Sequence, residues 1–222
     1  MKLKFRTFII VLIISCISFT GCKQSSSDKL SSKDINAKID KLIKSGHYDE
    51  AFVEIASAID EKTADYDTKI SLGWVYNYQK NYDKAQEILE EVVKDDTKNE
   101  EAYFALGVVY KNLKKYDDSI EMFNRAIELN PTNDKIYEYL ANLYEEQQNY
   151  EKAKWAYNKA IEIQPSESLY YFSLSQIYLK LGDYKHSIEN CEEALAKAPA
   201  EDKERIEQTL ETIKLSQILK QN

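Results

Sequence analysis

Residues 100–133 read EEAYFALGVVYKNLKKYDDSIEMFNRAIELNPTN. Apolar residues recur along this stretch at intervals of three and four, which is the spacing of an amphipathic α-helix. One apolar stripe runs from Leu106 to Leu113 and a second runs from Tyr116 to Ile127. Lys114 and Lys115 stand between the two stripes, and Pro131 follows the second, where proline cannot donate a further helical hydrogen bond. The stretch therefore predicts two antiparallel helices joined by a tight turn.

This pattern returns every 34 residues along most of the chain. Five consecutive units, 32–65, 66–99, 100–133, 134–167 and 168–201, keep the same register without insertion. One helix pair cannot bury both of its faces, so stacked units must cover each other. Four columns repeat in phase: Tyr48, Tyr82, Tyr116, Tyr150 and Tyr184; Ala51, Ala85, Ser119, Ala153 and Ser187; Ala58, Val92, Ala126, Ala160 and Ala194; and Pro131, Pro165 and Pro199.

The repeated unit resembles the tetratricopeptide repeat family. That family has Leu-Gly and then Tyr in its first helix, and Ala, a bulky apolar residue, Ala and Pro in and after its second. Here Leu106-Gly107, Tyr110 and Phe123 match, whereas Lys38-Ile39 replaces Leu-Gly in the first unit. The resemblance implies an all-α fold: a right-handed α-solenoid of five 34-residue helix-turn-helix repeats with a C-terminal capping helix. In that helix we expect Ile206, Leu210, Ile213 and Ile218 to face the last repeat.

The N-terminus has the pattern of a bacterial lipoprotein signal peptide. Three basic residues precede an apolar run, Phe8 to Phe19, that is short for a membrane span of ~20 residues. The sequence Phe19-Thr20-Gly21-Cys22 resembles a lipobox, which implies that Cys22 is acylated and begins the mature chain. Cys16 offers a competing site, and an uncleaved anchor or a plain secretory signal remains a third reading.

These patterns divide the chain into four segments. We expect a signal peptide at 1–21, a lipidated cysteine and polar tether at 22–32, repeats at 33–199 and a capping helix and tail at 200–222. Cleavage before Cys22 removes three positive charges and no acids, so the net charge falls from −8 to −11. Because nucleic-acid binding needs clustered Lys and Arg, we expect no nucleic-acid partner.

No pattern of catalytic or metal-binding residues is present, and we expect no catalytic residue, metal or cofactor. His47 and His186 lie in different units and favour surface positions. Cys191 occupies the column of Phe123 and Tyr157, which favours a buried apolar role over a nucleophilic one. Neighbouring acids such as Glu90-Glu91 point in different directions on a helix.

The resemblance instead implies a concave groove lined by the first helix of each unit. Its apolar residues would face a groove and not a core, or else be partly covered by neighbouring units. The family's carboxylate clamp is absent, since Asn36 and Asp40 occupy its positions in the first unit. The predicted partner-binding residues are Ile70, Trp74, Tyr78, Phe104, Val108, Lys111, Asn112, Glu138, Asn142, Phe172 and Gln176.

The sequence thus predicts a membrane-anchored scaffold of a bacterial cell envelope, in a one-membrane or two-membrane cell. Its partner would be a peptide or helix of an envelope protein. The alternative is binding of a glycan or small ligand, for which Asn and Gln beside Trp74 and Phe104 are suited. Homo-oligomerisation stays open.

Overall fold

The computed structural model describes residues 32–60 and 65–221, and within these ranges it contains eleven helices and no strand. The expected all-α repeat architecture is confirmed. Each unit supplies one first helix and one second helix, and a final helix follows the fifth unit. Their bounds are α2 Ser32–Lys44, α3 Tyr48–Asp60, α4 Tyr66–Tyr78, α5 Tyr82–Asp95, α6 Glu100–Asn112, α7 Tyr116–Leu129, α8 Asp134–Glu146, α9 Tyr150–Ile163, α10 Ser168–Lys180, α11 Tyr184–Lys197 and α12 Ala200–Gln221.

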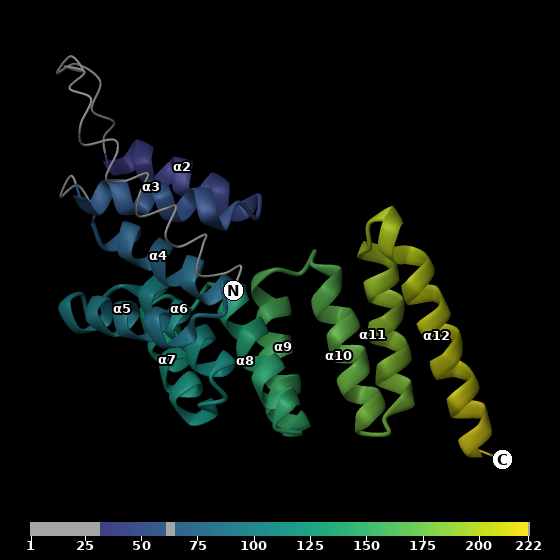
Figure 1. Cartoon of the computed structure of the whole chain (residues 1–222). Coiled ribbons are helices and arrows are strands. Elements are labelled where there is room, and N and C mark those ends of the chain that lie inside the picture. Colours follow the sequence, from purple (N-terminus) through teal and green to yellow (C-terminus); the bar gives the residue numbers. More distant parts are fainter. Residues whose placement is uncertain (1–31, 61–64, 222) are drawn as a thin grey trace, which may run out of the picture.

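The helix pairs stack in sequence order, and their axes turn progressively along the stack. The axes of α2 and α3 run across the view in Figure 1, whereas those of α10 to α12 run down it. Every second helix contacts the first helix of the following unit, which makes the stack continuous. The first helices α2, α4, α6 and α8 also contact one another in succession. They therefore form the inner layer of a curved solenoid.

The turn inside each unit uses one backbone conformation five times. Gly46, Lys80, Lys114, Gln148 and Gly182 all have positive φ, between 58° and 77°, and they are spaced by 34 residues. A left-handed residue at this place ends the first helix in the manner of an αL cap. Glycine adopts this conformation without steric cost, while lysine and glutamine do not. The turn geometry is thus repeated although its residue type is not.

Small residues of the first helices face bulky residues of the second helices. A Cβ added at Gly73 would lie 2.7 Å from the Leu89 side chain, and one added at Gly107 would lie 2.7 Å from the Phe123 ring. In the third unit the Ser119 hydroxyl also donates to the Gly107 carbonyl at 2.7 Å. The two helices of a unit are therefore joined by close backbone approach as well as by apolar burial.

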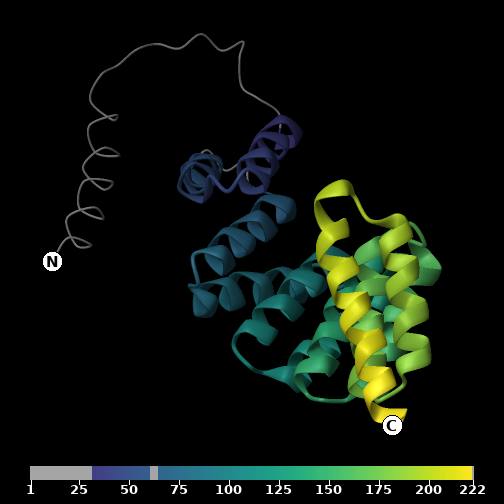
Figure 2. The same cartoon turned by 90° about the vertical axis from the view of Figure 1, so that its right-hand side faces the viewer.

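The C-terminal helix α12 packs along α11 and closes that end of the stack, as both views show (Figures 1 and 2). Ile206, Leu210 and Ile213 are buried against the last repeat, together with Cys191. Ile218, which we expected on the same face, is 54% exposed, so that expectation is wrong. Among the residues that the structure describes, no helix combines the length and hydropathy of a transmembrane span.

Candidate functional site

Five aromatic side chains form a connected row on the inner layer, which we call the aromatic path. Its order is Tyr48, Tyr78, Trp74, Phe104 and Tyr139, and all but Tyr48 come from first helices. Tyr48 and Tyr78 stack with ring centroids 4.6 Å apart, and Trp74 follows 6.1 Å from Tyr78. Phe104 lies 5.8 Å from Trp74 and 5.2 Å from Tyr139. The path therefore connects four consecutive units.

The members of the path differ in exposure. Tyr78 is 47% exposed, whereas Trp74, Phe104 and Tyr139 are partly buried and pack on the core. The expectation that neighbouring units partly cover Trp74 and Phe104 is therefore met. Burial of the same kind raises the pKa of the Tyr139 hydroxyl, with smaller contributions from Tyr78 and Glu138. The aromatic path is a half-open apolar strip rather than a row of free rings.

Two predicted groove residues are core residues. Ile70 is 1% exposed and packs with Leu89 and Ala105, and Val108 is 5% exposed and packs with Phe123. The prediction that Ile70 and Val108 face a partner is wrong. The physical reason is curvature: successive first helices contact each other, so positions near their shared seam are covered by the next unit.

Three polar pairs connect the ends of successive first helices, and we call them the inter-repeat ladder. The Asn112 side-chain amide donates to Asn77 at 2.7 Å, and Lys111 pairs with Glu146 at 2.9 Å. Lys180 pairs with Glu145 at 2.6 Å. Each pair spans 35 residues, so it joins equivalent places in adjacent units. Lys111 and Asn112, predicted to bind a partner, are thus engaged in holding units together.

Further along the inner layer, two more predicted groove residues have partners within the chain. Glu138 pairs with Lys135 at 3.0 Å on the same helix. Asn142 accepts a hydrogen bond of 2.6 Å from the hydroxyl of Tyr157, a side chain of the core. Neither the carboxylate nor the amide oxygen is therefore unpartnered.

At the C-terminal end, Phe172 and Gln176 lie beside the capping helix. The Arg205 guanidinium of α12 stands over the Phe172 ring at 4.7 Å from its centroid. The Nε2 atom of Gln176 is buried and has no hydrogen-bond partner among the described residues. The structure thus places α12 against a part of the groove that was predicted to be open.

Three exposed carboxylates flank the aromatic path near the N-terminal end. They are Asp40 on α2, Asp67 on α4 and Glu101 on α6. Desolvation, followed by the charges of Asp40 and Asp67, raises the pKa of Glu101, while Lys44 opposes this weakly. Desolvation and the charges of Asp65 and Asp40 likewise raise the pKa of Asp67. These acids thus share one region of the inner surface.

The site includes aromatic residues that the sequence argument missed. Tyr139 directly follows Glu138, but its place in the unit is not among those assigned to the groove. Tyr48 belongs to a tyrosine column that was interpreted as packing between units. A signal for Tyr139 was present, because it lies 35 residues after Phe104 and ladder pairs share that spacing. Tyr48 carries no such signal.

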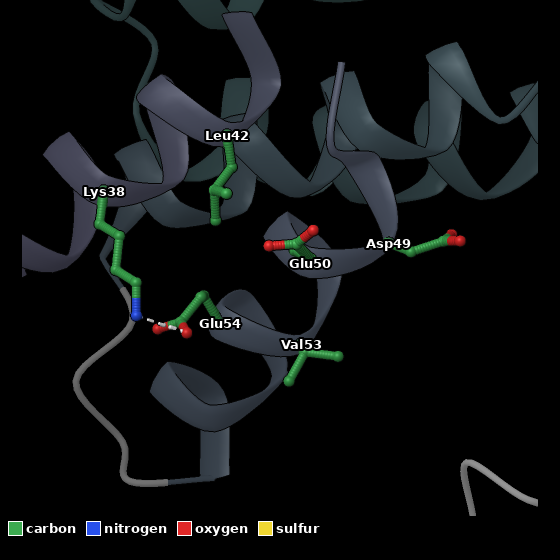
Figure 3. Close-up of a pocket in the computed structure, with 6 residues that line it drawn as sticks. All are labelled: Lys38, Leu42, Asp49, Glu50, Val53 and Glu54. Carbon is green, nitrogen blue, oxygen red and sulfur yellow. Dashed lines mark hydrogen bonds and ion pairs between the residues drawn. The ribbon is translucent and has the colours of Figure 1, made fainter. Parts of the chain in front are cut away.

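Hollows outside the inner layer lack the features of a reactive site. One of about 390 Å³ lies between α2 and α3, where Leu42 and Val53 meet charged side chains (Figure 3). Lys38 and Glu54 pair at 2.6 Å at its edge. Within residues 32–60 and 65–221, no group of three or more His, Cys, Asp or Glu could hold a metal ion. Burial raises the pKa of the Cys191 thiol, which disfavours the nucleophilic thiolate.

The predicted lipidation site, Cys22, and the signal peptide lie outside the described residues. Their assignment stays a prediction.

Comparison with known proteins agrees with this geometry. The family model described as "Tetratricopeptide repeat protein 21 C-terminal ARM domain" matches residues 20–211. No curated protein sequence matches the chain. A crystal structure of MamA is 28% identical, with a TM-score of 0.63, over 72% of this chain and 93% of that one. A MamA fragment, residues 41 to the end, from Desulfovibrio magneticus RS-1 is 19% identical, with a TM-score of 0.63 over 75% and 94% of the two chains.

A further comparison supports the fold alone. TTC0263, a thermophilic TPR protein from Thermus thermophilus, is 16% identical with a TM-score of 0.68, over 83% of this chain and all of that one. The phased columns, the stacked helix pairs and the family match all lead to one conclusion. The chain belongs to the tetratricopeptide repeat family.

Proposed function

We propose that this protein is a non-catalytic scaffold that binds another protein through its inner layer. The observation that carries the proposal is the aromatic path, a continuous apolar strip across four units with Tyr78 47% exposed. Aromatic residues dominate the energetics of protein interfaces, because they bury a large area with few rotatable bonds. A peptide or helix fits such a strip better than a small solute does.

The proposal includes the membrane anchor predicted from the sequence. Acylation of Cys22 would hold the protein to an envelope membrane, since several acyl chains bind more durably than one. The tether at 22–32 spans at most ~35 Å when extended, so the repeats would act near the membrane surface. Metabolic labelling with an alkyne palmitate tests this step. The account expects label on the wild type and on Cys16→Ser, and none on Cys22→Ser.

The glycan alternative loses support from the amides on which it depended. Asn77 and Asn112 bond each other, and Asn142 accepts from Tyr157. A sugar would have to break these hydrogen bonds before it could use the same groups.

The partner-binding step is tested by capture from detergent-solubilised envelopes, followed by titration of the purified partner. The baits are residues 23–222 as wild type, as Tyr78→Ala and as Trp155→Ala. Trp155 lies on α9 and is 48% exposed, which matches the exposure of Tyr78 away from the path. The proposal expects Tyr78→Ala, and not Trp155→Ala, to weaken the partner's affinity. Equal affinity for all three baits would exclude the inner layer as the binding face.

A further inference from the structure

The rings of the aromatic path differ from the other aromatic rings of this protein in what covers them. Nine rings elsewhere have a Lys or Arg cation within about 6 Å of the ring centroid. Examples are Lys152 over Tyr144 at 5.3 Å and Lys197 over Tyr171 at 5.0 Å. Within the described part of the chain, no cation stands over a ring of the path. These rings therefore keep a π-face without a cation of their own.

The carboxylates beside the path are also uncompensated. Farther along the inner layer, Glu138, Glu145 and Glu146 each pair with a lysine. Within residues 32–60 and 65–221, Asp40, Asp67 and Glu101 take part in no ion pair. The negative charge is thus concentrated on the N-terminal half of the inner layer, where Lys44 is the cation that acts on Glu101.

Charge and ring chemistry coincide on the same helices. Glu101 precedes Phe104 by three residues on α6, and Asp67 precedes Trp74 by seven residues on α4. Positions separated by three or seven residues share one face of a helix. The carboxylates and the rings consequently face the same groove. A ligand in that groove meets a half-open aromatic strip bordered by negative charge.

We propose that the occupant of the aromatic path is a basic amphipathic peptide segment, in which Lys or Arg alternates with bulky apolar residues. This inference rests on the proposed function and specifies the chemistry of its partner. Apolar side chains of the segment pack on Trp74 and Phe104, and its cations meet Asp40, Asp67 and Glu101. A cation over the face of Trp or Tyr adds a favourable interaction that a neutral residue lacks. An acidic segment is repelled by the same carboxylates.

The inference is tested with three fluorescein-labelled peptides of equal length and identical apolar residues. Their polar positions carry Lys, Gln or Glu, and affinities are measured by fluorescence anisotropy at low and high salt. The first variant is Asp40→Asn/Asp67→Asn/Glu101→Gln. The control variant, Glu87→Gln/Asp118→Asn/Glu121→Gln, removes the same charge from exposed positions on the second helices α5 and α7. The second variant pair is Tyr78→Ala and Trp155→Ala.

The account expects the Lys peptide to bind most tightly, and its affinity to fall about tenfold in the groove variant. The control variant should lose less than about threefold, and high salt should reduce the difference between the two variants. Binding of the Gln or Glu peptide as tightly as the Lys peptide, with Tyr78→Ala still weakening it, would overturn the basic partner and leave the scaffold intact. Binding that is insensitive to Tyr78→Ala would overturn the scaffold's groove itself. Absence of Lys-peptide binding overturns the inference.

Discussion

The close approach of Gly107 to Phe123 leads to a stability prediction with an opposite sign in two backgrounds. In Gly107→Ala the new Cβ would lie 2.7 Å from two ring carbons of Phe123, against an ordinary contact of at least 3.4 Å. Phe123 is fully buried, and its ring centroid lies 6.1 Å from that of Phe104 and 6.2 Å from that of Tyr139, so it has little room to yield.

The magnitude follows from two opposing effects. Overpacking of this kind costs about 1–3 kcal/mol, while Gly to Ala inside a helix gains about 1 kcal/mol. We therefore expect Gly107→Ala to reduce the free energy of unfolding by up to about 2 kcal/mol in the wild type. In a Phe123→Val background the two ring carbons are gone, and the same substitution should stabilise by about 1 kcal/mol.

The assay is urea unfolding of the four proteins of this double-mutant cycle, followed by circular dichroism. The coupling free energy is the quantity of interest, and it should be about 1–3 kcal/mol. Because Phe123 supports Phe104 and Tyr139, Gly107→Ala should also weaken binding at the aromatic path. Additive effects, with Gly107→Ala equally stabilising in both backgrounds, would refute the argument from close packing.

Three further predictions concern the turns, the inter-repeat ladder and the acids of the groove. Gly182→Ala should destabilise by about 1 kcal/mol in urea unfolding because its φ is +77°, while Lys114→Gly, at φ +61°, should be neutral or stabilising by up to about 1 kcal/mol. Lys111→Glu should lower the thermal midpoint, and Glu146→Lys in the same chain should restore part of the loss; no restoration would count against the pair. The pKa of Glu101 is raised in the folded state, so the folded chain binds this proton more tightly than the unfolded chain and the carboxylate disfavours folding above that pKa. Glu101→Gln should therefore stabilise at pH 7 by no more than about 0.5 kcal/mol after solvent screening, and this gain should vanish at acidic pH; an unchanged gain at acidic pH would contradict the electrostatic cause.

The architecture was predictable because the repeat fixes it many times over. The columns of Tyr116 and Ala126 place the second helix, Leu106-Gly107 places the first, and each recurs with a period of 34 residues. The buried state of Cys191 followed from its column in the same way and is confirmed. A local error in one unit is corrected by its neighbours, so the helix bounds were well determined.

The groove was less predictable because exposure depends on curvature, which the period does not encode. Val108 occupies a place that a less curved stack would expose, yet contact between successive first helices buries it. Lys111 appeared available because its partner Glu146 lies 35 residues away, and a charge match at that spacing is visible only once units are stacked. Cover by α12 at Phe172 was likewise set by tertiary packing.

The most direct test uses the two tryptophans of the chain as separate reporters. Trp155→Phe leaves Trp74 in the aromatic path, and Trp74→Phe leaves Trp155 on α9. Each protein is titrated with the unlabelled Lys peptide, and the accessibility of its tryptophan to acrylamide quenching is measured. The account predicts protection of Trp74 on binding and no change at Trp155. Protection of Trp155 alone, or binding that leaves Trp74 fully quenchable, would contradict partner recognition by the aromatic path.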